Sequence, residues 1–205
     1  MRSLSVAFLL LAAASSRASA DGFVDFVGGI AAPLGDNTWT NTVETSPKLG
    51  VRAGGFNSEG QLGGMLSLDW TPENLDNSGG AFPGGSVDTS GHRFRILVQA
   101  LAQQHVLPKV SIVERAGAGV DIARGAYSAS FLGSTTDHSD TNVGVGFEFG
   151  GGVWIAISDS MQLGGELAIP IGYHSHKSTG QNGDIAFDYT SYDLDLLFGV
   201  RLWSR

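Results

Sequence analysis

The sequence contains no cysteine among its 205 residues. Disulfide bonds and thiolate metal ligands are therefore excluded, and stability must come from strand or helix packing and hydrogen bonding. Basic residues are also scarce, because 12 lysines and arginines stand against 20 aspartates and glutamates. An acidic chain lacks the basic surface that nucleic acid requires, so we expect no nucleic-acid partner.

After residue 20 the chain has no apolar stretch long enough to span a membrane as a helix. A spanning helix needs roughly 20 consecutive apolar residues, and glycine or a polar residue interrupts every run well before that length. Lipid leaves a backbone two solutions, the helix and the closed barrel. Any membrane-spanning part of this chain must therefore be built from strands.

The N-terminal segment has the three parts of a secretory signal peptide. Arg2 supplies a positive charge, residues 6–14 are continuously apolar, and residues 18–20 read Ala-Ser-Ala, a small-residue cleavage site. We predict that residues 1–20 are removed and that residues 21–205 form one domain. Removal of Arg2 and Arg17 leaves 10 basic residues against 20 acidic ones, a net charge of −10.

The rest of the chain is rich in glycine, with 30 residues, and shows a two-residue alternation. Tyr192, Leu194 and Leu196 alternate with Asp193 and Asp195, which gives a strand one apolar and one polar face. The same pattern predicts eight strands. It is clear in residues 93–103, 143–150, 162–171 and 192–202, and weaker in residues 22–32, 47–56, 62–71 and 108–122.

The connections between these segments alternate in length. Long polar connections cover residues 33–46, 72–90, 123–141 and 174–186, and short ones cover residues 57–61, 104–107 and 158–161. Short periplasmic turns and long external loops are typical of transmembrane barrels. We therefore predict an all-β fold, an eight-stranded antiparallel up-and-down transmembrane β-barrel with both termini on the periplasmic side.

Residues 144–154, the turn 158–161 and the strand 162–167 resemble the small outer-membrane β-barrel superfamily, the outer-membrane protein A-like barrels. Residues 116–120 resemble a second strand motif of that group. The resemblance implies a porin-like fold in the outer membrane of a Gram-negative envelope, and it specifies no chemistry. We expect no peptidoglycan-binding domain after the barrel.

Two residues depart from the pattern of that superfamily. Glu114 falls in phase with the apolar Ile112 and Val120, so an unbroken strand would direct its carboxylate at lipid. We predict a β-bulge that redirects it inward. Members of the group commonly end on an aromatic residue, whereas this chain ends Trp203-Ser204-Arg205, and strict alternation points Trp203 inward.

Charged residues on the predicted inner face form the most coherent candidate site. An eight-stranded barrel has an interior just wide enough for side chains, so opposite charges there should pair. Glycines at positions 144, 146, 150 and 152 would give these long side chains room. The alternative is a narrow ion or small-solute channel. The predicted interior charge network comprises Arg93, Arg95, Glu148, Glu166, Asp193, Asp195 and Arg201.

Histidines in the predicted loops suggest two weaker hypotheses. His138, in the third long loop, and His174 and His176, in the fourth, lack the fixed spacing of metal sites, so we assign no metal and no cofactor and leave surface metal binding open. His176 and Ser178 resemble the His-x-Ser pair of lipid A deacylases, but Thr179 stands where that family has asparagine. We therefore predict no catalytic residues, and a lipid A-modifying enzyme remains an alternative.

These patterns predict a non-enzymatic integral outer-membrane protein, a monomer, with a structural or surface-interaction role. Its partners would be outer-membrane lipid and an extracellular ligand of the long loops. Trp70, Tyr173, Tyr189 and Tyr192 fall near the loop-side strand ends, where aromatic rings favour a membrane interface. A soluble periplasmic ligand-binding barrel is the third alternative, and it requires the apolar side chains to face inward.

Overall fold

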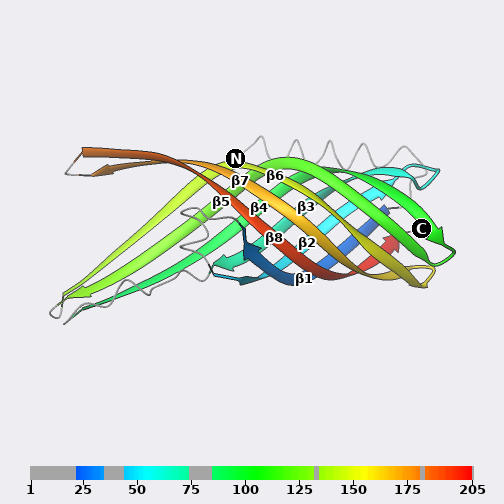
Figure 1. Ribbon diagram of the computed structural model, residues 1–205, viewed down its shortest axis with the longest axis horizontal. Coiled ribbons are helices and arrows are strands. Elements are labelled where there is room, and N and C mark those ends of the chain that lie inside the picture. The colour runs from blue at the N-terminus through cyan, green and yellow to red at the C-terminus, as the bar shows by residue number, and fades with distance from the viewer. Residues whose placement is uncertain (1–21, 35–43, 74–84, 132–133, 181–182, 205) are drawn as a thin grey trace.

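The computed structural model describes residues 22–34, 44–73, 85–131, 134–180 and 183–204. Within these ranges eight strands form one closed antiparallel barrel, which confirms the predicted fold class (Figure 1). The strands are β1 (Gly22–Pro33), β2 (Ser46–Phe56), β3 (Leu62–Glu73), β4 (Gly85–Leu107), β5 (Val110–Phe131), β6 (Ser134–Ser158), β7 (Met161–Gly180) and β8 (Gly183–Ser204). Among the described residues, no helix is long and apolar enough to cross a membrane.

The barrel closes through pairing of the first strand with the last. β1 and β8 pair continuously from Gly22 opposite Ser204 to Pro33 opposite Asp193, and the other edge of β1 pairs with β2. Each strand therefore has a hydrogen-bonded neighbour on both sides. Within the barrel itself, the closed sheet therefore leaves no exposed edge that would need water or another chain.

Short turns connect the strands at the end where both described termini lie. In the β2–β3 turn, Asn57 Oδ1 accepts hydrogen bonds from the backbone N–H groups of Gln61 (3.0 Å) and Leu62 (3.2 Å). Gly60 adopts a left-handed φ of 68° in this turn, where glycine carries no steric cost. The predicted turn at residues 104–107 is wrong, because β4 continues to Leu107 and the turn consists of residues 108–109.

At the opposite end the strands run much further than the sequence predicted. The sequence predicts loops over residues 123–141 and 174–186, yet β5 and β6 pair up to Phe131 opposite Ser134, and β7 and β8 pair up to Gly180 opposite Gly183. The apolar–polar alternation of the sequence is less regular there, and serine, threonine and aspartate are frequent. Backbone hydrogen bonds do not depend on that alternation, so the ladders continue.

These strand extensions form two separate units. The pairing of β6 with β7 begins at Gly144 opposite His174, although both strands continue beyond that point. β4, β5 and β6 extend together in one direction, and β7 and β8 extend as a hairpin in another (Figure 1). The end of the barrel opposite the short turns therefore carries two diverging β-structures.

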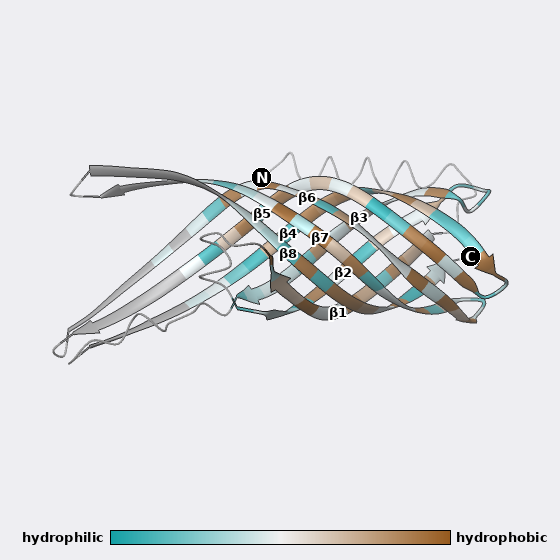
Figure 2. Cartoon of the chain, in the orientation of Figure 1, coloured by the Kyte–Doolittle hydropathy of each residue, from teal (hydrophilic) through white to brown (hydrophobic). Residues whose placement is uncertain are grey.

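The outward face of the barrel is apolar, and this arrangement is opposite to what the soluble-barrel alternative requires. Apolar and polar residues alternate along each strand (Figure 2). The side chains at the apolar positions point outward and are 46–63% exposed in representative cases: Phe26, Val51, Leu68, Val98, Phe149, Leu167 and Phe198. Tyr173 and Tyr192 also point outward, whereas Tyr189 lies outside the residues whose side chains are described.

Glu114 keeps to this outward face, so the predicted bulge is wrong. β5 runs through this position without a register change, with Glu114 opposite Ala102 of β4 and Gly151 of β6. Its side chain is exposed, while the adjacent Val113 and Arg115 are buried. The register shift in this hairpin lies closer to the turn, between His105 and Leu107.

Candidate functional site

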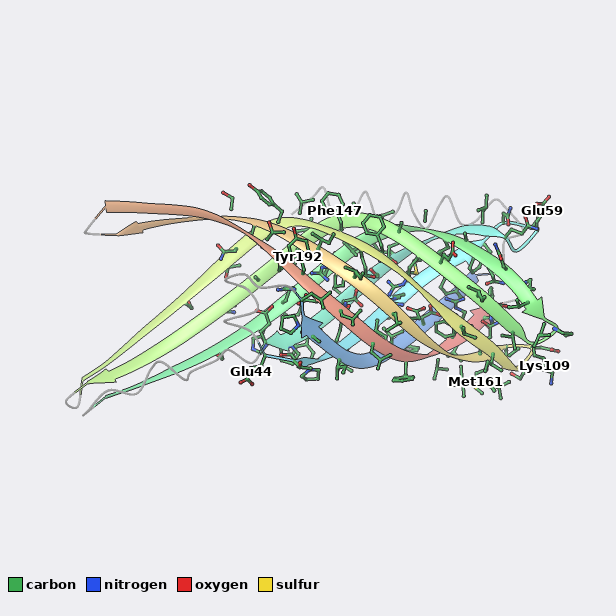
Figure 3. All side chains as sticks on the ribbon, in the orientation of Figure 1. Glu44, Glu59, Lys109, Phe147, Met161 and Tyr192 are labelled. Atoms are coloured by element: carbon green, nitrogen blue, oxygen red, sulfur yellow. The ribbon has the colours of Figure 1, made fainter. Side chains whose placement is uncertain are left out.

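The barrel interior is the most strongly charged region of the described structure. Side chains from all eight strands fill it between the turn end, marked by Glu59 and Lys109, and the loop end, marked by Glu44 (Figure 3). Buried ions are costly unless they are paired and hydrogen-bonded. Within the described residues, eight buried carboxylates (Asp25, Asp69, Glu73, Asp121, Glu148, Glu166, Asp193 and Asp195) accompany six buried basic groups (Lys48, Arg52, Arg93, Arg95, Arg115 and Arg201).

An apolar cluster closes the interior near the turn end. Its buried members come from six different strands, and Trp203 of β8 packs against them. The rings of Phe23 and Phe56 lie 5.5 Å apart, and the Trp203 ring lies 5.6 Å from Phe23 in an edge-to-face arrangement. Trp203 therefore points inward. The buried members are Phe23, Phe56, Met65, Leu101, Val113 and Trp154.

Arg201 contacts both this apolar cluster and the charged network of the interior. Its guanidinium carbon lies 4.2 Å from the ring centre of Phe23 and 4.3 Å from that of Trp154, within the range of cation–π attraction. Its Nε and Nη2 atoms each donate to Asp25 at 2.8 Å. A bidentate pair of this kind is geometrically specific, and it joins β8 to β1 where the barrel closes.

Glu166 and Glu148 form the centre of the network. Glu166 accepts from Arg52 at 2.6 Å and lies 3.1 Å from Arg115 Nη2. The indole N–H of Trp154 also donates to Glu166, at 3.1 Å. Arg115 Nη1 pairs with Glu148 through Oε1, so one guanidinium holds both glutamates. Both carboxylates therefore have cationic partners in a region that water barely reaches.

Lys48 has three carboxylate neighbours in the lumen. Its ammonium lies 2.5 Å from Asp195, 3.6 Å from Glu148 and 3.7 Å from Asp69. These three carboxylates come from β8, β6 and β3, so Lys48 connects β2 with strands on other sides of the barrel. A compact ammonium can serve several carboxylates at once.

A third group of charges occupies the loop end of the lumen. Arg93 lies 3.0 Å from Glu73 and 2.6 Å from Asp193. Arg95 donates to Asp121 at 2.7 Å, and the buried His174 approaches the same carboxylate at 3.7 Å. This group extends the ion-pair network to the level where the strand extensions begin.

Glycines on the inner face give the large side chains room, as predicted for some positions. A Cβ at Gly152 would lie 2.5 Å from the Glu166 side chain, and one at Gly144 would lie 2.8 Å from the His174 ring. The closest approach of an aromatic ring is at Gly164, where a Cβ would lie 2.4 Å from Trp154. Gly150 differs, because its neighbour is Ala168.

Comparison with solved structures gives the same architecture. A major outer membrane protein from Thermus thermophilus superposes with a TM-score of 0.59 at 14% identity, over 91% of this chain and 100% of that chain. This is the fold of the small outer-membrane β-barrels. Neisserial surface protein A also matches, with a TM-score of 0.49 at 14% identity over 88% of this chain and 96% of that chain. No protein-family model and no curated protein matches the sequence.

All seven residues of the predicted charge network lie inside this outer-membrane-type barrel. Arg93 and Asp193 contact each other, whereas the other five pair with charged residues that the sequence analysis did not name. Arg95 pairs with Asp121, Arg201 with Asp25 and Asp195 with Lys48. Glu148 and Glu166 share Arg115, and Arg52 also binds Glu166.

The missed partners lie on strands whose alternation is weak in the sequence. Asp25 stands between Val24 and Phe26, and Lys48 stands between Pro47 and Leu49. Each is therefore flanked by outward-facing apolar residues, and this flanking is the pattern in the sequence that indicates an inward-facing charge. Most of these partners belong to the weaker strand segments 22–32, 47–56, 62–71 and 108–122.

The histidine hypotheses change with the structure. His174 was predicted in a loop but lies on β7 with its side chain buried in the lumen. The backbones of His138, His176 and Ser178 also lie on strands, and their side chains are outside the described set. Among the side chains that are described, no group of three or more metal-ligating residues could hold a metal ion.

Proposed function

We propose that this protein is a non-enzymatic integral protein of the outer membrane with a structural or surface-interaction role. The observation that carries the proposal is the inverted distribution of its side chains. Valine, leucine, isoleucine and phenylalanine cover the outside of the barrel, while ion pairs fill the inside. Such an exterior is unfavourable in water and suits a hydrocarbon environment.

The interior contacts support a scaffold rather than a channel. Arg52 of β2 pairs with Glu166 of β7, and Arg93 of β4 pairs with Asp193 of β8, so both pairs cross the lumen. The apolar cluster around Trp154 adds contacts among six strands near the turn end. A permeating ion would have to separate these contacts. Purified protein in planar bilayers should therefore give no steady conductance, and a conductance altered by Glu148→Gln would favour the channel.

Recognition outside the cell would use the two strand extensions. In the proposed orientation, the extensions of β4–β6 and the β7–β8 hairpin lie outside the membrane, at the end of the barrel opposite the short turns. Exposed segments on a rigid scaffold are common sites of binding. The protein would be a monomer in lipid, with an extracellular ligand as a second partner.

Fractionation tests the location directly. Cells that express the full chain should carry the protein in the outer-membrane fraction, and its N-terminus there should be Asp21 if residues 1–20 are a signal peptide. Closed membrane barrels resist SDS until heated, so unboiled samples should migrate differently from boiled ones. Recovery in the soluble periplasm without a heat-dependent shift would overturn the membrane proposal.

Lipid A analysis tests the non-enzymatic part of the proposal. Mass spectra of lipid A from cells with and without the protein should be identical. A change in acylation that disappears in Ser178→Ala, with the heat-dependent shift retained, would instead establish the deacylase alternative.

A further inference from the structure

A pocket opens at the turn end of the barrel, next to the apolar cluster. It has a volume of about 650 Å³, within the range of roughly 300–1,000 Å³ typical of small-molecule sites. All three short turns and the last strand contribute to its wall. The residues that matter for its chemistry are Phe56, Gln103, His105, Lys109, Gln162 and Trp203. Figure 3 shows Lys109 at this end of the barrel.

Two glutamines in the wall have unused hydrogen-bonding capacity. Gln103 and Gln162 are 5% and 9% exposed, and the side-chain oxygen of each lacks a hydrogen-bond partner among the described residues. The other end of the Gln103 amide is held by His105, at 3.1 Å, and His105 is held in turn by Ser111, at 2.9 Å. Buried amide oxygens are normally hydrogen-bonded. Both oxygens are covered in the structure, and because the terminal torsion of glutamine is broad, rotation of each amide would turn its oxygen toward a ligand, at Gln103 with loss of the bond to His105.

The charge of the wall favours a neutral ligand. Lys109 and Asp159 contribute one charge of each sign at the rim. Neither an anion nor a cation therefore finds an excess of opposite charge here. A ligand with several hydroxyl or N–H donors would satisfy the two glutamine oxygens, and its remaining oxygens could accept from Lys109.

The aromatic part of the wall narrows the class of ligand further. Trp203 is partly exposed and borders the pocket, while Phe56 lies behind it. An indole presents an apolar face beside polar groups. A sugar ring has the matching form, because its C–H face is apolar and its rim carries hydroxyl groups. We propose that this pocket binds a neutral saccharide of one or two rings, packed on Trp203 and hydrogen-bonded to Gln103 and Gln162.

The test uses the purified barrel in a detergent without sugar headgroups. Tryptophan fluorescence is titrated with two probes, cellobiose and N,N′-diacetylchitobiose. We expect saturable binding of at least one of them. The variants Gln103→Met and Gln162→Met should each weaken that binding about threefold to tenfold, as expected for the loss of one hydrogen bond.

Gln104→Met is the matched control. Gln104 follows Gln103 on the same strand, and its side chain is exposed on the outer face. This variant should bind the probe as the unaltered protein does. If Gln103→Met fails to fold, as judged by its heat-dependent shift, Gln162→Met alone decides. Absence of saturable binding, or equal affinity in Gln162→Met and Gln104→Met, would overturn the proposal.

A final arm distinguishes the source of the saccharide. Co-sedimentation with purified cell-wall sacculi, lost in Gln162→Met, would identify a polymeric glycan, and binding of the soluble probe without co-sedimentation would identify a free oligosaccharide. Both results support a saccharide site. Because the titration is done on isolated protein, its outcome is independent of the fractionation that tests the membrane proposal.

Discussion

Replacing Glu166 with glutamine should destabilise the barrel strongly. This change keeps the shape of the side chain and removes its charge. Arg52, at 2.6 Å, and Arg115, at 3.1 Å, would then face a neutral amide in a buried environment. The Trp154 indole would compete for the one remaining carbonyl oxygen.

The magnitude follows from the burial of the partners. Arg52 and Arg115 are 1% and 4% exposed. Breaking a buried ion pair on one side costs about 3–5 kcal/mol, because it leaves charge uncompensated. Arg115 retains Glu148, so we expect the lower end of this range, about 3 kcal/mol. That loss corresponds to more than about a hundredfold in the unfolding equilibrium.

Glu114→Gln is the control, because the same chemical change is made on the outer face. Its carboxylate is exposed among apolar neighbours, so removing the charge should leave stability unchanged or raise it slightly. Both variants are unfolded in urea after insertion into lipid vesicles, with tryptophan fluorescence and the gel shift as readouts. If Glu166→Gln costs no more than Glu114→Gln, the interior charges are screened by water, and the packed-network interpretation is refuted.

Two further predictions test packing and closure. Gly164→Val should prevent assembly, because a Cβ there would lie 2.4 Å from the Trp154 ring. Gly165→Ala should be tolerated, because its Cβ would lie 3.5 Å from its nearest neighbour. The heat-dependent gel shift shows whether each variant forms the barrel. A double variant Ile30→Cys and Leu196→Cys should form a disulfide in the folded barrel and none in urea, because these residues are directly opposite in the β1–β8 register and the chain has no other cysteine. A link that forms equally well in urea would contradict this closure.

The eight strands could be predicted from sequence because two environments impose the alternation. Leu194, Leu196 and Phe198 had to face one way, and Asp193 and Asp195 the other. The same logic fails at the strand extensions, where glycine, serine, threonine and aspartate are frequent and a loop is the usual expectation. Residues 123–141 therefore looked like a loop, although the register of β5 with β6 carries both strands through them.

The predicted interior residues lie on the inner faces of β4, β6, β7 and β8, but their partners could not be found in the same way. Alternation reports the direction of a side chain and says nothing about its height along the barrel axis. Height depends on the stagger between neighbouring strands, which alternation leaves open. Lys48 meets Asp195 across 147 positions of sequence. Glu114 was misjudged for a related reason, because we assumed that a charge on the outer face needed a bulge to remove it.

The positions of the ion pairs explain why so acidic a chain can form a stable barrel. Arg201 and Asp25 join β8 to β1, and Asp195 and Lys48 join β8 to β2. These contacts can form only after β8 has met β1. Before closure, the excess carboxylates repel one another in a chain already rich in negative charge. Closure therefore converts an unfavourable charge distribution into a paired one. The pairs that cross this seam favour the closed barrel over an open sheet, whereas a pair between neighbouring strands, such as Arg95 with Asp121, can form before closure.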